Sequence, residues 1–451
     1  MVNSVLVRHK TARSDRSELE RYGGRIHEVR RCSAPRLGES QIVASSTKSE
    51  LPLGSHRALR LANERRILAM LRRDGPSSQA HLARATGLSR ATVNNIAKSL
   101  AAEGVLDVRP GATGRETTVS FAAPHGTLVA VDLGHRRIHG SLISLDAKTR
   151  LDEFAELGRE EDGGIDLQTL AAVVHRLLER AGILPDEVRA VCVGLHAPFD
   201  ASSGRIAPTA ILPGWEGFDV RAALRERLGF EVIVDNDANF AALAEWTWGA
   251  GRGSDHFLYV KSSNGIGAGL VLDGRLYRGS NGMAGELGHI VVDDRGAVCN
   301  CGNRGCLSAV ASGRALLLQL QAAGNIRTSL RDVIEGARAG DAACARVLVE
   351  AGHHLGTALA HVVKVIAPST IAIGGELAAA GSLVFDSVQS AITEHSLRAV
   401  AAPLRILEGI RRADMCILGC VAAMLTELGA GVSDLPEWLL RPTDSRIRGS
   451  A

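Results

Sequence analysis

Residues 281–308 have the sequence NGMAGELGHIVVDDRGAVCNCGNRGCLS, which contains three of the eight cysteines of this 451-residue chain. The three thiols lie within eight residues, and a histidine precedes the first of them by ten positions. A redox site predicts a Cys-x-x-Cys spacing, which is absent here, and disulfides would leave one thiol over and require an oxidising compartment. A structural zinc site takes four ligands of this kind in a closed tetrahedron. The residues therefore favour one structural zinc ion per chain, with the ligands His289, Cys299, Cys301 and Cys306.

The composition of the whole chain is that of an ordinary globular protein, with 45% hydrophobic and 22% charged residues. Aromatic residues make up only 3%, so we expect an aliphatic core. The net charge of +3 is too small to indicate nucleic-acid binding, and any DNA contact must come from a local patch. No apolar run is long enough for a membrane span or a secretory signal. Together with the scattered remaining cysteines, this predicts a cytoplasmic protein without membrane contact.

The chain divides into four segments by pattern. Residues 1–55 are rich in Arg, Ser and Glu and predict a flexible, mildly basic tail. Residues 56–122 form a compact helical unit with a short hairpin. From the buried strand TLVAVDLG onward, residues 127–432 alternate apolar strands with amphipathic helices, as in an α/β fold. Residues 433–451 predict a polar tail.

The helical unit contains three helices with clear boundaries. The first ends at Asp74-Gly75-Pro76, and the second begins near Ser78, a favourable N-cap. Ser89 caps the third helix, which ends at Gly104. Apolar spacing predicts which side chains face the core. In the second and third helices these are Leu82, Ala85, Val93, Ile96 and Leu100.

The other face of the third helix carries short side chains that donate hydrogen bonds. Such side chains reach base edges and phosphates. Two alternating strands with a Gly-containing tip follow, and they predict a winged hairpin whose arginines contact the DNA backbone or minor groove. A three-helix protein-interaction module is the alternative. The predicted DNA-binding residues are Ser89, Arg90, Thr92, Asn94, Asn95, Lys98, Arg109 and Arg115.

Three motifs occur in order in the α/β part: VDNDAN at 234–239, NGMAGELGH at 281–289 and CNCGNRGC at 299–306. With this spacing the chain resembles the ROK family of repressors and sugar kinases over about residues 60–430. The resemblance implies a winged helix-turn-helix followed by an α/β, two-lobed, actin-like (ribonuclease H-like) domain with a sugar cleft between the lobes. It also implies the four zinc ligands named above, and dimers or tetramers.

The resemblance leaves a sugar kinase and a regulator to be distinguished. Asp237 matches the family's catalytic base and Asp132 the acid of the first loop. The first phosphate turn of ROK kinases is Asp-x-Gly-Gly-Thr, but here His135 and Arg136 replace the second glycine and the threonine. In the second turn Asn264 replaces a threonine. We therefore expect no enzymatic activity and treat Asp237 as a vestigial base. A kinase with a degenerate phosphate loop is the alternative.

The resemblance also assigns an effector site, made of Asn236, Asp237, Glu286 and His289. Three positions depart from the family pattern. Ile211 replaces an asparagine, Ser308 replaces a glutamate, and His196 occupies a turn usually written Val-Pro-Gly-Pro. We therefore expect a sugar or sugar-phosphate effector, but not necessarily a standard hexose.

Together these features predict a DNA-binding transcriptional regulator, a repressor by default, of sugar-related genes. Its partners would be a double-stranded DNA operator, a cleft-bound effector and further copies of itself, as a homodimer or homotetramer. A DNA-binding regulator that responds to no ligand is the remaining alternative.

Overall fold

The computed structural model describes residues 56–110, 117–122, 125–134, 137–157, 167–207, 215, 217–427 and 436–441. Several predictions fall on residues outside these ranges. They concern the tail at 1–55, most of the tail at 433–451, and the side chains of Arg115, His135, Arg136 and Ile211. Within the described residues, no helix has the length and apolar character needed to cross a membrane.

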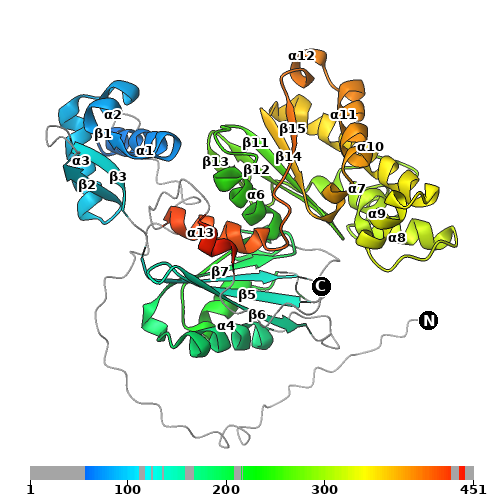
Figure 1. The fold of residues 1–451 in the computed structure, drawn as a ribbon, viewed down its shortest axis with the longest axis horizontal. Helices are drawn as coiled ribbons and strands as arrows, with labels where there is room; N and C mark the ends of the chain where they lie inside the picture. The colour runs from blue at the N-terminus through cyan, green and yellow to red at the C-terminus, as the bar shows by residue number, and fades with distance from the viewer. Residues whose placement is uncertain are drawn as a thin grey trace, which may run out of the picture. The chain divides into compact units, whose positions relative to one another are not determined.

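The N-terminal unit, here called the head, contains three helices and a small antiparallel sheet in the order β1-β3-β2 (Figure 1). Ser78 and Ser89 cap the second and third helices as predicted, because their hydroxyl oxygens accept hydrogen bonds from the backbone N–H groups of His81 and Thr92. The elements are α1 (His56–Asp74), β1 (Ser77–Ser78), α2 (Gln79–Thr86), α3 (Arg90–Ala102), β2 (Leu106–Pro110) and β3 (Thr117–Phe121).

The core of the head confirms the inward faces of α2 and α3 with one exception. Leu82, Val93, Ile96 and Leu100 are buried as predicted. The prediction for Ala85 was wrong, since this residue is exposed while Ala83 is buried. Successive helical residues turn by about 100°. An inward face centred between Leu82 and Ala83 therefore leaves Ala85 towards solvent.

The first lobe of the body is a five-stranded sheet in the order β10-β7-β4-β5-β6. β4, β5 and β6 form an antiparallel meander, whereas β7 and β10 add in parallel on the other side of β4. α4 (Leu167–Ala181) and α5 (Val220–Leu228) bury their apolar residues against this sheet. The strands are β4 (Thr127–Leu133), β5 (Arg137–Ser144), β6 (Thr149–Glu156), β7 (Val188–Leu195) and β10 (Val232–Asn236), with a small hairpin of β8 (Phe199–Asp200) and β9 (Arg205–Ile206) and a turn η1 (Pro185–Glu187).

The second lobe repeats this topology, with the sheet order β13-β12-β11-β14-β15 and the same antiparallel and parallel pairs. Its strands are β11 (Phe257–Ser262), β12 (Ile266–Leu272), β13 (Arg275–Tyr277), β14 (Thr370–Gly374) and β15 (Arg405–Glu408). Its helical elements are η2 (Leu287–His289), α7 (Leu307–Ala311), α8 (Gly313–Ala322), α9 (Leu330–Arg338), α10 (Ala342–Ile366), η3 (Glu376–Ala380), α11 (Ser382–His395) and α12 (Arg398–Ala401).

Two helices form a shared layer between the lobes. α6 (Asp237–Trp248) follows the last strand of the first lobe, and α13 (Met415–Glu427) follows the last strand of the second (Figure 1). Their small and aliphatic residues pack with residues of both sheets in one core cluster. The two helices cross closely, because a Cβ atom at Gly419 would lie 1.7 Å from the carbonyl oxygen of Phe240. The body is therefore the two-lobed α/β architecture that the sequence predicts.

A fully buried arginine connects the first lobe to the C-terminal segment. The Arg150 guanidinium donates to Asp152 at 3.0 Å, to Asp414 at 2.6 Å and to the carbonyl oxygen of Leu439 at 3.0 Å. Leu439 is itself buried in the turn η4 (Glu437–Leu440), inside the segment predicted as a polar tail. Leu439 thus belongs to the core, and the carbonyl oxygens of Leu439 and Leu440 accept hydrogen bonds from Arg150 and Arg412.

We predict that Arg150→Met destabilises the protein by about 3 kcal/mol, because two buried carboxylates each lose one charged partner, while Asp414 keeps Arg412 and Asp152 keeps His139. Urea unfolding measures the change. Arg176→Met is the matched control, since Arg176 forms an exposed ion pair with Glu153, and exposed pairs contribute at most about 1 kcal/mol. Equal losses in the two variants would contradict the structural role of Arg150.

Candidate functional site

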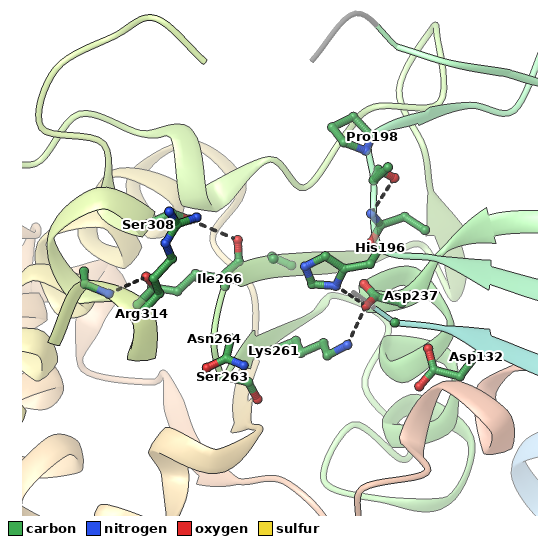
Figure 2. A pocket seen from close by; sticks show the side chains of 18 of the residues that line it. Asp132, His196, Pro198, Asp237, Lys261, Ser263, Asn264, Ile266, Ser308 and Arg314 are labelled. Atoms are coloured by element: carbon green, nitrogen blue, oxygen red, sulfur yellow. Dashed lines mark hydrogen bonds and ion pairs between the residues drawn. The ribbon is translucent and has the colours of Figure 1, made fainter. Parts of the chain in front are cut away.

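A cleft of about 1540 Å³ is lined by residues of both lobes and of the layer between them. Figure 2 shows the polar side chains that project into it from the strand ends. Asp132 lies near the end of β4, His196 follows β7, and Asp237 begins α6. From the second lobe come Lys261 of β11 and Asn264 in the following turn.

Asp237, the predicted vestigial base, is buried and paired with two cleft residues. Its Oδ2 atom lies 2.5 Å from Nζ of Lys261 and 2.7 Å from Nδ1 of His196 (Figure 2). Burial alone would raise the pKa of Asp237, but the charges and hydrogen bonds of Lys261 and His196 outweigh it and hold this pKa well below its usual range. Asp237 is therefore ionised at neutral pH, and its Oδ2 atom is already engaged by Lys261 and His196.

A second carboxylate at the same strand end also pairs with the second lobe. Asp235 is 1% exposed, and its Oδ2 atom accepts a hydrogen bond from Nε of Arg278 at 2.6 Å. Its other oxygen accepts from Nδ2 of Asn239 at 2.8 Å. Asp235 at the end of β10 and Asp237 at the start of α6 thus each pair with a cation of the second lobe, Arg278 and Lys261.

The four residues predicted to bind the effector all line the cleft. Glu286 is half-buried, and burial together with the nearby Asp237 raises its pKa to about 7. Asn236 differs from the prediction in how its amide is used. Its Oδ1 caps α6 by accepting from the N–H of Ala238, and its Nδ2 donates to the carbonyl oxygen of Ala197 at 3.0 Å. The Asn236 side chain thus supports the cleft wall.

The predicted metal ligands lie together: their ligand atoms are all within 4.8 Å of one another. Sγ of Cys299 is 3.6 Å from Nδ1 of His289, and Sγ of Cys301 is 3.6 Å from Sγ of Cys306. The loop can fold this way because Gly305 has φ +69°, and a Cβ atom there would lie 1.4 Å from the carbonyl oxygen of Asp293. This cluster of one histidine and three cysteines could hold a metal ion.

His289 belongs to both the cluster and the cleft. Its Nδ1 faces the cysteines, while its Nε2 lies 3.9 Å from Oε2 of Glu286. At the end of the same stretch, Ser308 lines the cleft, and its hydroxyl donates only a long bond of 3.4 Å to the carbonyl oxygen of Ile266 (Figure 2). The position that departs from the family pattern is therefore part of the cleft wall.

On the head, the structure places the predicted DNA-binding residues of α3 with different exposure. Arg90, Asn95 and Lys98 are exposed. Asn94 is half-buried and accepts a 3.4 Å hydrogen bond from Gln79 of α2, so it also helps to join the two helices. The hydroxyls of Ser89 and Thr92 bond each other at 2.9 Å near the helix start, and Arg109 is exposed and pairs with Asp107.

Sequence reasoning missed Lys261 as a site residue and noted His196 only as an unusual turn residue. Lys261 is the only cation near the end of the apolar strand HFLYVKSS, and this is the feature of the sequence that could have indicated a site residue. Its partner lies 24 positions earlier in the chain. The spacing of residues along the sequence does not show such a pair.

The fold and the cleft define a two-domain class of protein, in which a winged helix-turn-helix head precedes a duplicated α/β body. Residues 60–107 match the model described as winged helix-turn-helix DNA-binding, and residues 128–426 match the ROK family model. The chain belongs to the ROK family, which confirms the resemblance inferred from the motifs.

Relatives of this chain include both regulators and a kinase. It is 26% identical over 396 residues to a protein named xylose repressor from Caldicellulosiruptor bescii, covering 83% of this chain and 98% of that protein. It is 29% identical over 327 residues to a glucokinase from Thermotoga maritima, covering 68% of this chain and 99% of that protein. A solved ROK family transcriptional regulator, a homologue of the E. coli MLC protein, has a TM-score of 0.70 at 25% identity, covering 85% of this chain and 98% of that one. The regulators match across head and body.

We predict that Lys261→Met lowers stability by roughly 1.5–3 kcal/mol at pH 7, because Asp237 loses a charged hydrogen-bond partner. The pKa of Asp237 is depressed in the folded state, so its contribution is present above its unfolded value and declines below about pH 4. The gap between variant and parent should therefore shrink as the pH falls below 4. Unfolding curves between pH 7 and pH 3 measure it.

Lys364→Met provides the control, since Lys364 is exposed on α10. A deficit in Lys261→Met that stays constant with pH, or one no larger than in the control, would show that Lys261 does not stabilise the Asp237 carboxylate.

Proposed function

We propose that this protein is a DNA-binding transcriptional regulator, acting as a repressor of sugar-related genes, with residues 56–122 as its DNA-binding domain and 127–432 as its effector-binding domain. This proposal rests on helix α3 of the winged head, whose exposed face carries side chains that donate hydrogen bonds. The match to a protein named xylose repressor, which covers 98% of that protein and 83% of this chain, supports the same conclusion.

In the proposed DNA complex, α3 enters the major groove. Arg90, Asn95 and Lys98 face base edges and phosphates. Ser89, Thr92 and Asn94 contact the DNA backbone near the start of the helix. Arg109 and Arg115 of the wing contact the backbone or minor groove. Two copies of the chain, in a homodimer or homotetramer, read the two halves of a pseudo-palindromic operator.

The proposed effector binds in the cleft. Asp237 keeps its Oδ1 atom for a ligand hydroxyl, and Glu286 with Nε2 of His289 presents polar atoms on the same cleft. Carboxylates and imidazole suit vicinal hydroxyls, since they accept or donate hydrogen bonds in pairs. A ligand that contacts both lobes biases lobe closure, and through it the spacing of the two heads in the dimer.

We propose that the cleft does not act as a sugar kinase. A general base requires a pKa near the working pH and access to the hydroxyl proton. Asp237 has a strongly depressed pKa and shares Oδ2 with Lys261 and His196. The His196 ring also faces the glycine-rich turn, since a side chain at Gly265 would place its Cβ atom 3.5 Å from Nε2 of His196. Transfer of phosphate from ATP to a sugar, abolished by Asp237→Asn, would contradict this proposal.

We also propose that the cluster of His289, Cys299, Cys301 and Cys306 holds one structural zinc ion. Thiolates at about 2.3 Å from zinc lie roughly 3.8 Å apart in a tetrahedron. The 3.6 Å between Sγ of Cys301 and Sγ of Cys306 fits this edge. The ion would fix the loop that carries His289, so the imidazole would present its Nε2 to the cleft in one orientation.

The zinc assignment predicts about one zinc per chain in the purified protein. Cys301→Ser should lower the metal content and reduce the free energy of unfolding by more than about 2 kcal/mol, since zinc binding contributes on the order of 10 kcal/mol in small zinc peptides. Elemental analysis and urea unfolding measure both. Asn300→Ser, between the two cysteines, is the control. Full stability of a metal-free protein would contradict the assignment.

The DNA-binding assignment predicts that Arg90→Ala and Asn95→Ala each weaken binding to a duplex selected from a randomised DNA pool by about 1–3 kcal/mol. A gel-shift titration at fixed salt measures this, and circular dichroism checks the fold. Arg346→Ala removes the same charge from the exposed face of α10 and should leave binding unchanged. Unchanged affinity in the α3 variants would refute the recognition-helix assignment.

A further inference from the structure

One wall of the cleft differs in charge from the rest. This second-lobe wall consists of the lining residues between Ser308 and Thr328, on α7, α8 and the segment that leads to α9. It carries two arginines, Arg314 and Arg327, and no carboxylate. The acidic residues that line the cleft all lie elsewhere.

The two arginines of this wall differ in their partners. Arg327 is engaged, since its guanidinium pairs with Asp341 at 2.6 Å and donates to the Asn325 side chain at 3.0 Å. Arg314, the second residue of α8, is exposed, and among the described residues its guanidinium has no ion pair or side-chain hydrogen bond. Figure 2 shows it directed into the cleft beside Ser308. An arginine fork thus stands next to a small, neutral side chain.

The remaining charges of the cleft do not repel an anion. Seven arginine and lysine side chains line it, against five carboxylates. Asp237 is neutralised by Lys261 and His196. The Arg150 guanidinium, described above, binds both Asp152 and Asp414. Two of these cations, Arg327 and Arg411, pair with Asp341 and Glu408 outside the lining. The charges of the cleft and of its partners therefore balance, and on the second-lobe wall the guanidinium without an ion pair is that of Arg314.

We propose that the cleft recognises a polyol that carries a negative charge, whose phosphate or carboxylate group binds the guanidinium of Arg314 beside Ser308. This inference rests on the proposed function, since it names the chemical class of the effector. The two parts of such a ligand match the two parts of the site. Its hydroxyls bond Oδ1 of Asp237 and Glu286, and its anionic group takes the planar fork of Arg314, which suits both phosphate and carboxylate in bidentate geometry.

The small side chain at 308 is part of this recognition. A carboxylate at this position would lie close to the guanidinium and compete with the ligand for it. Ser308 uses its hydroxyl only in the long bond to the Ile266 carbonyl oxygen and leaves the guanidinium available. Arg314 is thus a specificity-determining residue, and neutral polyols should bind the same cleft more weakly.

The test is a calorimetric titration of the full-length protein with glucose, glucose 6-phosphate, glucose 1-phosphate, glucuronate and inorganic phosphate. The phosphorylated sugars and the uronate separate the two sources of the charge, and inorganic phosphate reports binding of the anion alone. At least one charged sugar should bind more tightly than glucose. Arg314→Gln should weaken that ligand by about tenfold to a hundredfold, the range expected for a charged hydrogen bond.

Two further variants make the result specific. Arg314→Lys keeps the charge without the fork and should give an intermediate affinity. Arg331→Gln removes the same charge from the exposed face of α9, outside the cleft lining, and should have no effect. Glucose binding as tightly as the charged sugars, or an Arg314→Gln affinity equal to that of the parent, would overturn the inference.

The same preparations are tested for binding to the selected duplex without ligand. If no sugar of either kind binds while the duplex is bound, the anionic-effector inference is refuted and the DNA-binding proposal stands. If the duplex is not bound but a charged sugar binds through Arg314, the regulator proposal fails and the ligand class holds.

Discussion

A carboxylate that is buried where a strand meets a helix needs a cationic partner. This requirement determines which side chains meet at the centre of the molecule. The junction between β10 and α6 carries Asp235 and Asp237, and each takes a cation from the second lobe, Arg278 and Lys261. Burying an ionised group costs free energy because the group loses its hydrating water, unless a partner of opposite charge compensates the loss. These two ion pairs therefore hold the facing parts of the two lobes together. The other polar residues at these strand ends line the cleft.

The duplicated architecture explains why the cleft lies where it does. Each lobe ends its fifth strand with a helix, and the two helices pack as one layer with residues of both sheets. The strand ends of both lobes then point towards one space, which collects Asp132, Asp237 and Lys261 from segments far apart in the chain. One ligand in this space can contact residues of both lobes.

The sequence predicts the fold well because its signals are local. The caps at Ser78 and Ser89 and the cysteine spacing at 299–306 each depend on neighbours within a few residues. The errors and omissions concern tertiary contacts. Ala85 is exposed because packing sets the direction of α2, and the Asn236 amide bonds the backbone of Ala238 and of Ala197, which is 39 positions away. The Lys261–Asp237 pair joins separate lobes, and no periodicity in the sequence indicates it.

We propose that Asp237 is ionised at neutral pH and acts as a hydrogen-bond acceptor, not as a general base. Carbon-13 NMR of aspartate-labelled protein, with the Asp237 signal assigned through Asp237→Asn, measures this directly. The account predicts that the Asp237 carboxyl signal remains that of the ionised form from pH 7 down to pH 4, because Lys261 and His196 depress its pKa. A carboxyl signal that titrates within that window would contradict the account and would restore Asp237 as a candidate catalytic base.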